Sequence, residues 1–115
     1  DGIEALKQIE QNPDTCLVIT DYEMPKMDGF TLIQRIREKH DKNEIAIIGL
    51  SSSGEQGLSA RFLKNGANDF IVKPFGAEEF YCRVTQNVET IENLRRLKQV
   101  EGELARLREK GVKSE

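Results

Sequence analysis

Three polar residues each follow directly on a short, mainly apolar run of the sequence: Asp21, Ser51 and Lys73. These runs have the length and residue types of buried parallel strands, and they cover residues 16–20, 45–50 and 69–72. The carboxyl ends of neighbouring parallel strands meet at one rim of a sheet, where open α/β sheets bind their ligands. The sequence therefore predicts a carboxylate, a hydroxyl and an ammonium together on a rim that can bind a charged ligand.

Each of these residues also has an ordinary structural explanation when it is taken alone. Asp21 can cap a turn or a helix, and Ser51 can cap the segment that follows its strand. Lys73 can be a solvated loop lysine. A shared site is favoured because all three residues occupy the same position relative to their strands.

The elements that would position these residues alternate strictly between strand and helix. Apolar residues recur at helical spacing over residues 3–9, 30–39 and 55–65. Gly66 lies where a left-handed helix C-cap is expected. This alternation predicts an α/β fold built on a right-handed parallel sheet.

A long helical segment follows Val84. Its apolar residues recur at steps of three and four, and they are Val88, Ile91, Leu94, Leu97, Val100, Leu104 and Leu107. A helix of this length cannot pack entirely on a small sheet, so we expect the part beyond about Leu94 to form a coiled coil or a linker, weakened locally by Gly102. We therefore divide the chain into a globular part, residues 1–90, and a helical extension, residues 91–115, toward an output domain outside the chain.

Composition bounds the class of protein. The chain has 115 residues, of which 37% are hydrophobic and 32% charged, with a net charge of −3. These values predict a soluble domain without a membrane span, and the lack of a dense basic block argues against direct nucleic-acid binding. Cys16 and Cys82 have no metal-site or disulfide-framework spacing, which indicates a reducing compartment and a cytoplasmic location. The chain begins without a signal sequence and without Met, inside a helical pattern, so we do not interpret Asp1 as a natural start.

Four motifs in this order resemble the receiver domain of two-component response regulators. They are Asp21-Tyr-Glu-Met-Pro-Lys-Met-Asp-Gly29, Ile47-Ile-Gly-Leu-Ser51-Ser52, Gly66-Ala-Asn-Asp69-Phe70 and Lys73-Pro-Phe75. Ser51 and Lys73 follow Asp21 by 30 and 52 residues, a spacing that fits the family. The resemblance spans most of residues 1–90 and implies a flavodoxin-like, doubly wound parallel sheet, here truncated to about three strands and followed by a long C-terminal helix.

The resemblance implies a phosphorylation switch rather than an enzyme. Asp21 would take a phosphoryl group from a histidine kinase or a phosphotransfer protein, and Lys73 would contact the transferring oxygens. Ser51 would donate a hydrogen bond to the phosphoryl group, after which the aromatic ring of Phe70 would turn inward. Phe70 lacks the hydroxyl of the Tyr that is commoner in the family, which is a departure that bears on partner contacts.

The family's magnesium site is incomplete in this sequence. Of the family's ligands, the chain retains the Asp21 carboxylate and the backbone carbonyl of Glu23, but it lacks the acidic pair of an upstream strand. We therefore expect Mg2+ in the intact domain and weak or absent binding here. The absent part corresponds to a β-α-β unit, so we interpret the chain as a receiver fragment whose strand at residues 16–20 is an exposed edge. That edge or the C-terminal helix would support a homodimer.

Two other functions share features with this sequence. A phosphatase of the haloacid dehalogenase type also uses a strand-end aspartate, but it needs Asp where this chain has Glu23, and it needs a cap domain. A receiver-like scaffold that is never phosphorylated would use the long helix only for dimerisation and positioning.

By analogy with similar proteins, a cyclic-dinucleotide cyclase could follow the helix as an output domain.

Overall fold

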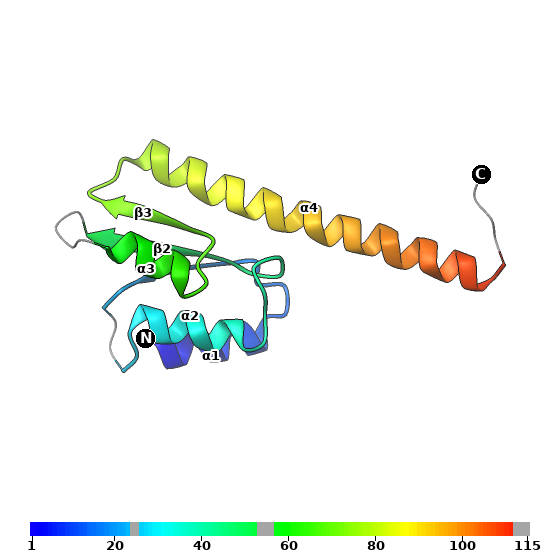
Figure 1. The fold of residues 1–115 in the computed structure, drawn as a ribbon, viewed down its shortest axis with the longest axis horizontal. Coiled ribbons are helices and arrows are strands. Elements are labelled where there is room, and N and C mark those ends of the chain that lie inside the picture. The colour runs from blue at the N-terminus through cyan, green and yellow to red at the C-terminus, as the bar shows by residue number, and fades with distance from the viewer. Residues whose placement is uncertain (24–25, 53–56, 112–115) are drawn as a thin grey trace.

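The computed structural model describes residues 1–23, 26–52 and 57–111. Strands and helices alternate along the chain (Figure 1). Their bounds are α1 Gly2–Gln11, β1 Leu17–Asp21, α2 Gly29–Arg37, β2 Ala46–Ser52, α3 Leu58–Lys64, β3 Asp69–Lys73 and α4 Ala77–Glu109. The predicted helix at 55–65 is therefore described only from Leu58 onward.

The three strands form one parallel sheet in the order β1-β2-β3. Helices α1 and α2 lie on one side of this sheet and α4 on the other, while α3 packs beside β2 and β3 (Figure 1). The main core lies between α1, α2, α3 and the sheet, and Phe30, Ile33 and Phe62 are among its buried residues. This layered arrangement confirms the predicted flavodoxin-like α/β fold with three strands and a long C-terminal helix.

The two outer strands differ from the central one in burial. In β2, Ile47 and Ile48 are fully buried, as predicted for a strand that is covered on both faces. In β1, by contrast, Ile19 is 39% exposed. The prediction of a strand buried on both faces is therefore wrong for β1, because β1 is an edge strand and α4 contacts only β2 and β3 closely.

Helix α4 is continuous over 33 residues and passes through Gly102 without a break. Its first part runs along the sheet, where Ile91 is buried, and its second part extends beyond the body of the domain (Figure 1). On this second part Leu97, Val100 and Leu104 are 58%, 56% and 40% exposed. No helix in the described ranges is long and apolar enough to cross a membrane.

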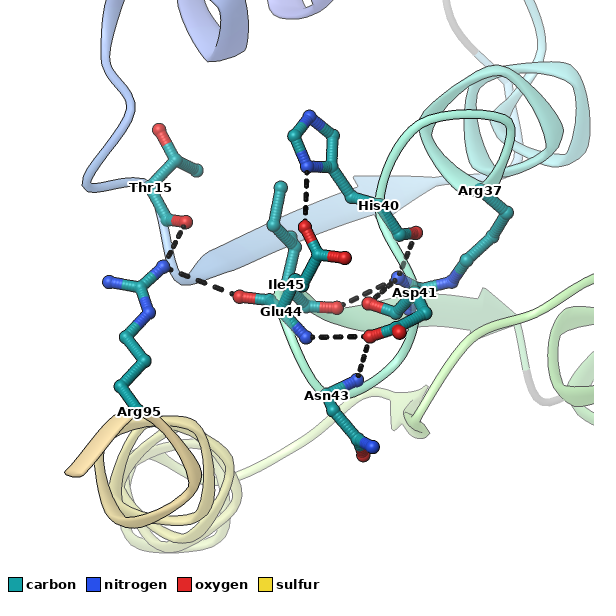
Figure 2. Close-up of polar contacts among 8 residues, drawn as sticks. All are labelled: Thr15, Arg37, His40, Asp41, Asn43, Glu44, Ile45 and Arg95. Carbon is teal, nitrogen blue, oxygen red and sulfur yellow. Dashed lines mark hydrogen bonds and ion pairs between the residues drawn. The ribbon is translucent and has the colours of Figure 1, made fainter. Parts of the chain in front are cut away.

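Two arginines tie the elements together near the amino ends of the strands (Figure 2). Arg37 at the end of α2 donates to the carbonyl oxygens of Gly66, Asp41 and Ile45 at 2.8, 2.8 and 2.9 Å. Burial lowers the pKa of the Arg37 guanidinium, and the carboxylates of Asp41 and Glu44 oppose that shift. An arginine nevertheless stays charged in a protein, so this contact persists across the physiological pH range.

The second of these residues, Arg95, fixes α4 to the sheet. Its guanidinium donates to the carbonyl oxygens of Thr15, Glu44 and Asp14 at 2.9, 3.3 and 3.3 Å. Two of these carbonyls lie two and three residues before β1, and the third lies two residues before β2. Arg95 therefore anchors α4 at the end of the sheet opposite to the strands' carboxyl ends.

Candidate functional site

Asp21 and Lys73 contact each other at the carboxyl end of the sheet. The Lys73 Nζ donates to Asp21 Oδ1 at 2.7 Å. Asp21 is the last residue of β1 and Lys73 the last of β3, so the pair spans the end of the central strand. Both side chains remain about two-fifths exposed, at 43% for Asp21 and 41% for Lys73, and a ligand can reach them. The structure thus brings the predicted carboxylate and ammonium together, while their roles stay a prediction.

A hollow of about 260 Å³ opens beside this pair. Its lining comes from the ends of all three strands, from the two residues after β1 and from the start of α3, and consists of Asp21, Tyr22, Glu23, Leu50, Ser52, Leu58 and Lys73. In the sheet register Asp21 lies opposite Leu50, and Lys73 lies opposite Ser52. Because side chains alternate along a strand, these four residues share one face of the sheet.

Ser51 does not line this hollow. It lies on the opposite face of β2, its side chain is 1% exposed, and its Oγ is 2.9 Å from the Oγ of Ser59 in α3. The structure therefore does not bring the Ser51 hydroxyl into contact with Asp21 and Lys73, and its role at the site stays a prediction. Strand alternation is the reason, since it places the neighbouring Ser52, and not Ser51, on the face of the sheet that carries Asp21 and Lys73.

The loop after β1 is held close to Asp21 by a glycine. The Gly29 N–H donates to the carbonyl oxygen of Tyr22 at 2.7 Å. A β-carbon at Gly29 would lie 2.2 Å from the Asp21 carbonyl oxygen, so no larger residue fits there without moving the backbone. Asp28 caps α2 by accepting from the Thr31 N–H at 2.8 Å. The Met24-Pro25 part of the motif lies outside the described residues.

Phe70 lies on the face of the sheet that carries Ser51. It is half-buried and pairs in register with Gly49, over which the ring of Phe62 packs. A β-carbon at Gly49 would lie 2.4 Å from Phe62 Cγ, so glycine allows α3 to approach β2 closely. Both residues of the predicted switch, Ser51 and Phe70, therefore face α3 rather than the hollow.

The residues at the hollow do not fit a magnesium ion held by this chain alone. Within the described part of the chain, no three His, Cys, Asp or Glu residues gather where they could hold a metal ion. The carboxylate nearest to the predicted site, Asp21, is already bonded to Lys73. The roles of Asp21 and of the Glu23 carbonyl as metal ligands stay predictions.

Sequence reasoning missed two residues of this region, Ser52 and Ser59. Strand alternation could have indicated Ser52, because Ser51 and Ser52 must point to opposite faces. No pattern in the sequence indicates Ser59, whose contact with Ser51 depends on how α3 packs against β2.

Comparison with known proteins gives a consistent family. A model described as the response regulator receiver domain matches residues 1–85. Chemotaxis protein CheY1 of Helicobacter pylori is 39% identical over 74 residues, which cover 64% of this chain and 60% of CheY1. The sensor histidine kinase TmoS of Ectopseudomonas mendocina is 38% identical over 85 residues, covering 74% of this chain and 9% of TmoS.

Solved structures agree with these relatives. The structure of a probable two-component system response regulator/GGDEF domain protein superposes with a TM-score of 0.76 and 50% identity. The match covers 79% of this chain and 37% of that protein. The chain thus spans about three-fifths of CheY1 and smaller parts of the longer relatives.

Proposed function

Because the chain belongs to the response regulator receiver domain family, we propose that Asp21 accepts a phosphoryl group from a histidine kinase or a phosphotransfer protein. The family makes the chain a signalling domain of a two-component system and not a classical enzyme. The observation that carries the proposal is the contact of Asp21 with Lys73, 2.7 Å apart beside an open hollow.

The chemistry is a displacement at phosphorus. A carboxylate oxygen of Asp21 forms a bond to the phosphorus of a phosphohistidine, and the bond from phosphorus to the imidazole nitrogen breaks. The electron pair of that bond stays on the imidazole, which takes up a proton from water. The ammonium of Lys73 offsets the negative charge of the transferring oxygens, because it already lies within hydrogen-bond distance of the attacking group.

Two features of the site support this assignment over a scaffold that is never phosphorylated. The Asp21 carboxylate is 43% exposed at the carboxyl end of the sheet, so a donor can approach it. The loop behind it is packed closely enough to require Gly29, which fixes the position of the nucleophile. A scaffold needs neither feature.

Both described cysteines are free, in keeping with a cytoplasmic location.

Intact-mass spectrometry after incubation with acetyl phosphate tests the proposal. We expect the chain to gain one phosphoryl group, Asp21→Asn to gain none, and Asp14→Asn, an exposed carboxylate outside the hollow, to behave like the wild type. A longer protein that contains this sequence is measured in parallel. Modification of the longer protein alone would place part of the site outside these residues, and modification of neither would favour the scaffold.

We also propose that the second part of α4 pairs with the same segment of another copy. Leu97, Val100 and Leu104 are exposed and are separated by three and four residues, which is the spacing of a coiled-coil seam. Sedimentation of the wild type and of Leu104→Lys tests this pairing. We expect a dimer that the lysine dissociates, whereas an unchanged dimer would point to the edge strand β1 as the contact.

A further inference from the structure

The hydroxyls of Ser51 and Ser59 form a hydrogen bond between the central strand and α3. The two Oγ atoms are 2.9 Å apart, and either can donate. Ser51 is buried at the end of β2, and Ser59 is half-buried in the first turn of α3. The bond therefore joins the end of the strand next to the site to the beginning of the adjacent helix.

The Ser51 side chain lies on the face of the sheet opposite to Asp21, and this bond holds its hydroxyl toward α3. Asp21 and Lys73 share one face of the sheet, and Ser51 belongs to the other. A phosphoryl group on Asp21 offers only acceptors, so Ser51 can bond to it only as a donor, after turning away from Ser59. The hydroxyl of Ser59 is half-buried and can then bond to water instead, so the free-energy cost of breaking the Ser51–Ser59 hydrogen bond stays small.

We propose that Ser59 is a positioning residue that holds the Ser51 hydroxyl in the resting state, turned toward α3. If Asp21 is phosphorylated, as proposed above, Ser59 opposes the switch to the phosphorylated state, and this consequence rests on the proposed function. Phe70 lies on the same face of the sheet as Ser51, so the bond and the predicted aromatic switch belong to the same face.

The side-chain rotamer of Ser51 gives a test that needs no phosphorylation. Three-bond couplings between the α and β protons of Ser51 are measured in the wild type, Ser59→Ala and Ser59→Thr. We expect one rotamer in the wild type and in Ser59→Thr, which keeps the hydroxyl, and averaged couplings in Ser59→Ala. A single unchanged rotamer in Ser59→Ala would overturn the proposal.

Phosphorylation by acetyl phosphate gives a second readout, measured with Ser51 intact and in a Ser51→Ala background. Loss of one neutral hydrogen bond from the resting state predicts that Ser59→Ala raises the ratio of phosphorylated to unmodified chain about threefold to tenfold. We expect no increase when Ser51 is already alanine. An equal increase in both backgrounds would overturn the proposal, because Ser59 would then act without Ser51.

The two readouts separate the two hypotheses. A wild type that gains no mass would count against Asp21 as the acceptor. The couplings of Ser51 would still decide whether Ser59 holds its hydroxyl, because they are recorded on the unmodified chain.

Discussion

Replacement of Lys73 by methionine separates a role in chemistry from a role in stability. The Asp21–Lys73 pair is short, at 2.7 Å, but both side chains are about two-fifths exposed. Solvent screens a pair of this kind, so its loss is expected to lower the free energy of unfolding by less than about 1 kcal/mol. Phosphoryl transfer depends more strongly on the same cation, because charge develops on the transferring oxygens. Loss of one such positioned group typically slows a reaction by on the order of 10²-fold.

The assay combines urea unfolding with the time course of phosphorylation by acetyl phosphate, followed by intact mass. Lys26→Met is the matched control, because Lys26 is a surface lysine whose side chain is 69% exposed. We expect Lys73→Met to keep its unfolding midpoint and to lose the reaction, and Lys26→Met to keep both. A wild-type rate in Lys73→Met would refute the role of Lys73. A stability loss of about 3 kcal/mol or more would refute the treatment of the pair as solvent-screened.

Three further outcomes are expected. Gly49→Ala should lower the free energy of unfolding by about 1–3 kcal/mol, because its β-carbon would lie 2.4 Å from Phe62 Cγ; an unchanged urea midpoint would contradict the close approach of α3. Arg95→Met keeps the aliphatic part of the side chain but removes the hydrogen bonds to Thr15 and its neighbours. It should lower the free energy of unfolding by about 1.5 kcal/mol and speed amide exchange in α4 near residue 95. Equal exchange in both chains would argue against the anchor. Millimolar MgCl2 should leave the thermal unfolding midpoint of this chain unchanged, because the described carboxylates do not gather into a metal site. A metal that binds only the folded state raises this midpoint, so a clear rise would reveal a site that these carboxylates do not form.

The fold was predictable from the sequence because local patterns and tertiary environment agree in most elements. The apolar run around Ile47 and Ile48 predicts a buried strand, and both residues are fully buried. The equally apolar run before Asp21 gives the same prediction, but Ile19 is 39% exposed. Residue types show that a strand can be covered on both faces, whereas neighbouring elements determine whether it is.

The site was predictable only as far as strand ends determine it. The meeting of Asp21 and Lys73 follows from their positions at the ends of parallel strands. The direction of the Ser51 hydroxyl depends on the packing of α3 and on which of Ser51 and Ser52 faces this helix. A sequence pattern places the end of a strand only to within a residue or two, so it does not determine which of the two residues does so. Arg37 and Arg95 look like solvated helix residues in the sequence, because their partners, which are mainly backbone carbonyls, come together only in the folded chain.

The anchoring of α4 by Arg95 makes this helix a lever with a fixed pivot. The helix begins four residues after Lys73, at the functional end of the sheet, and is held at the opposite end by Arg95. The fourteen residues that follow Arg95, up to Glu109, extend about 21 Å beyond this pivot, at 1.5 Å per residue. A tilt of about 10° around Arg95 would therefore move the far end of the helix by about 4 Å. The arm from Ala77 to Arg95 is about 27 Å long, so a displacement of α4 near the hollow would reach the far end of the helix in the opposite direction and at about four-fifths of its size.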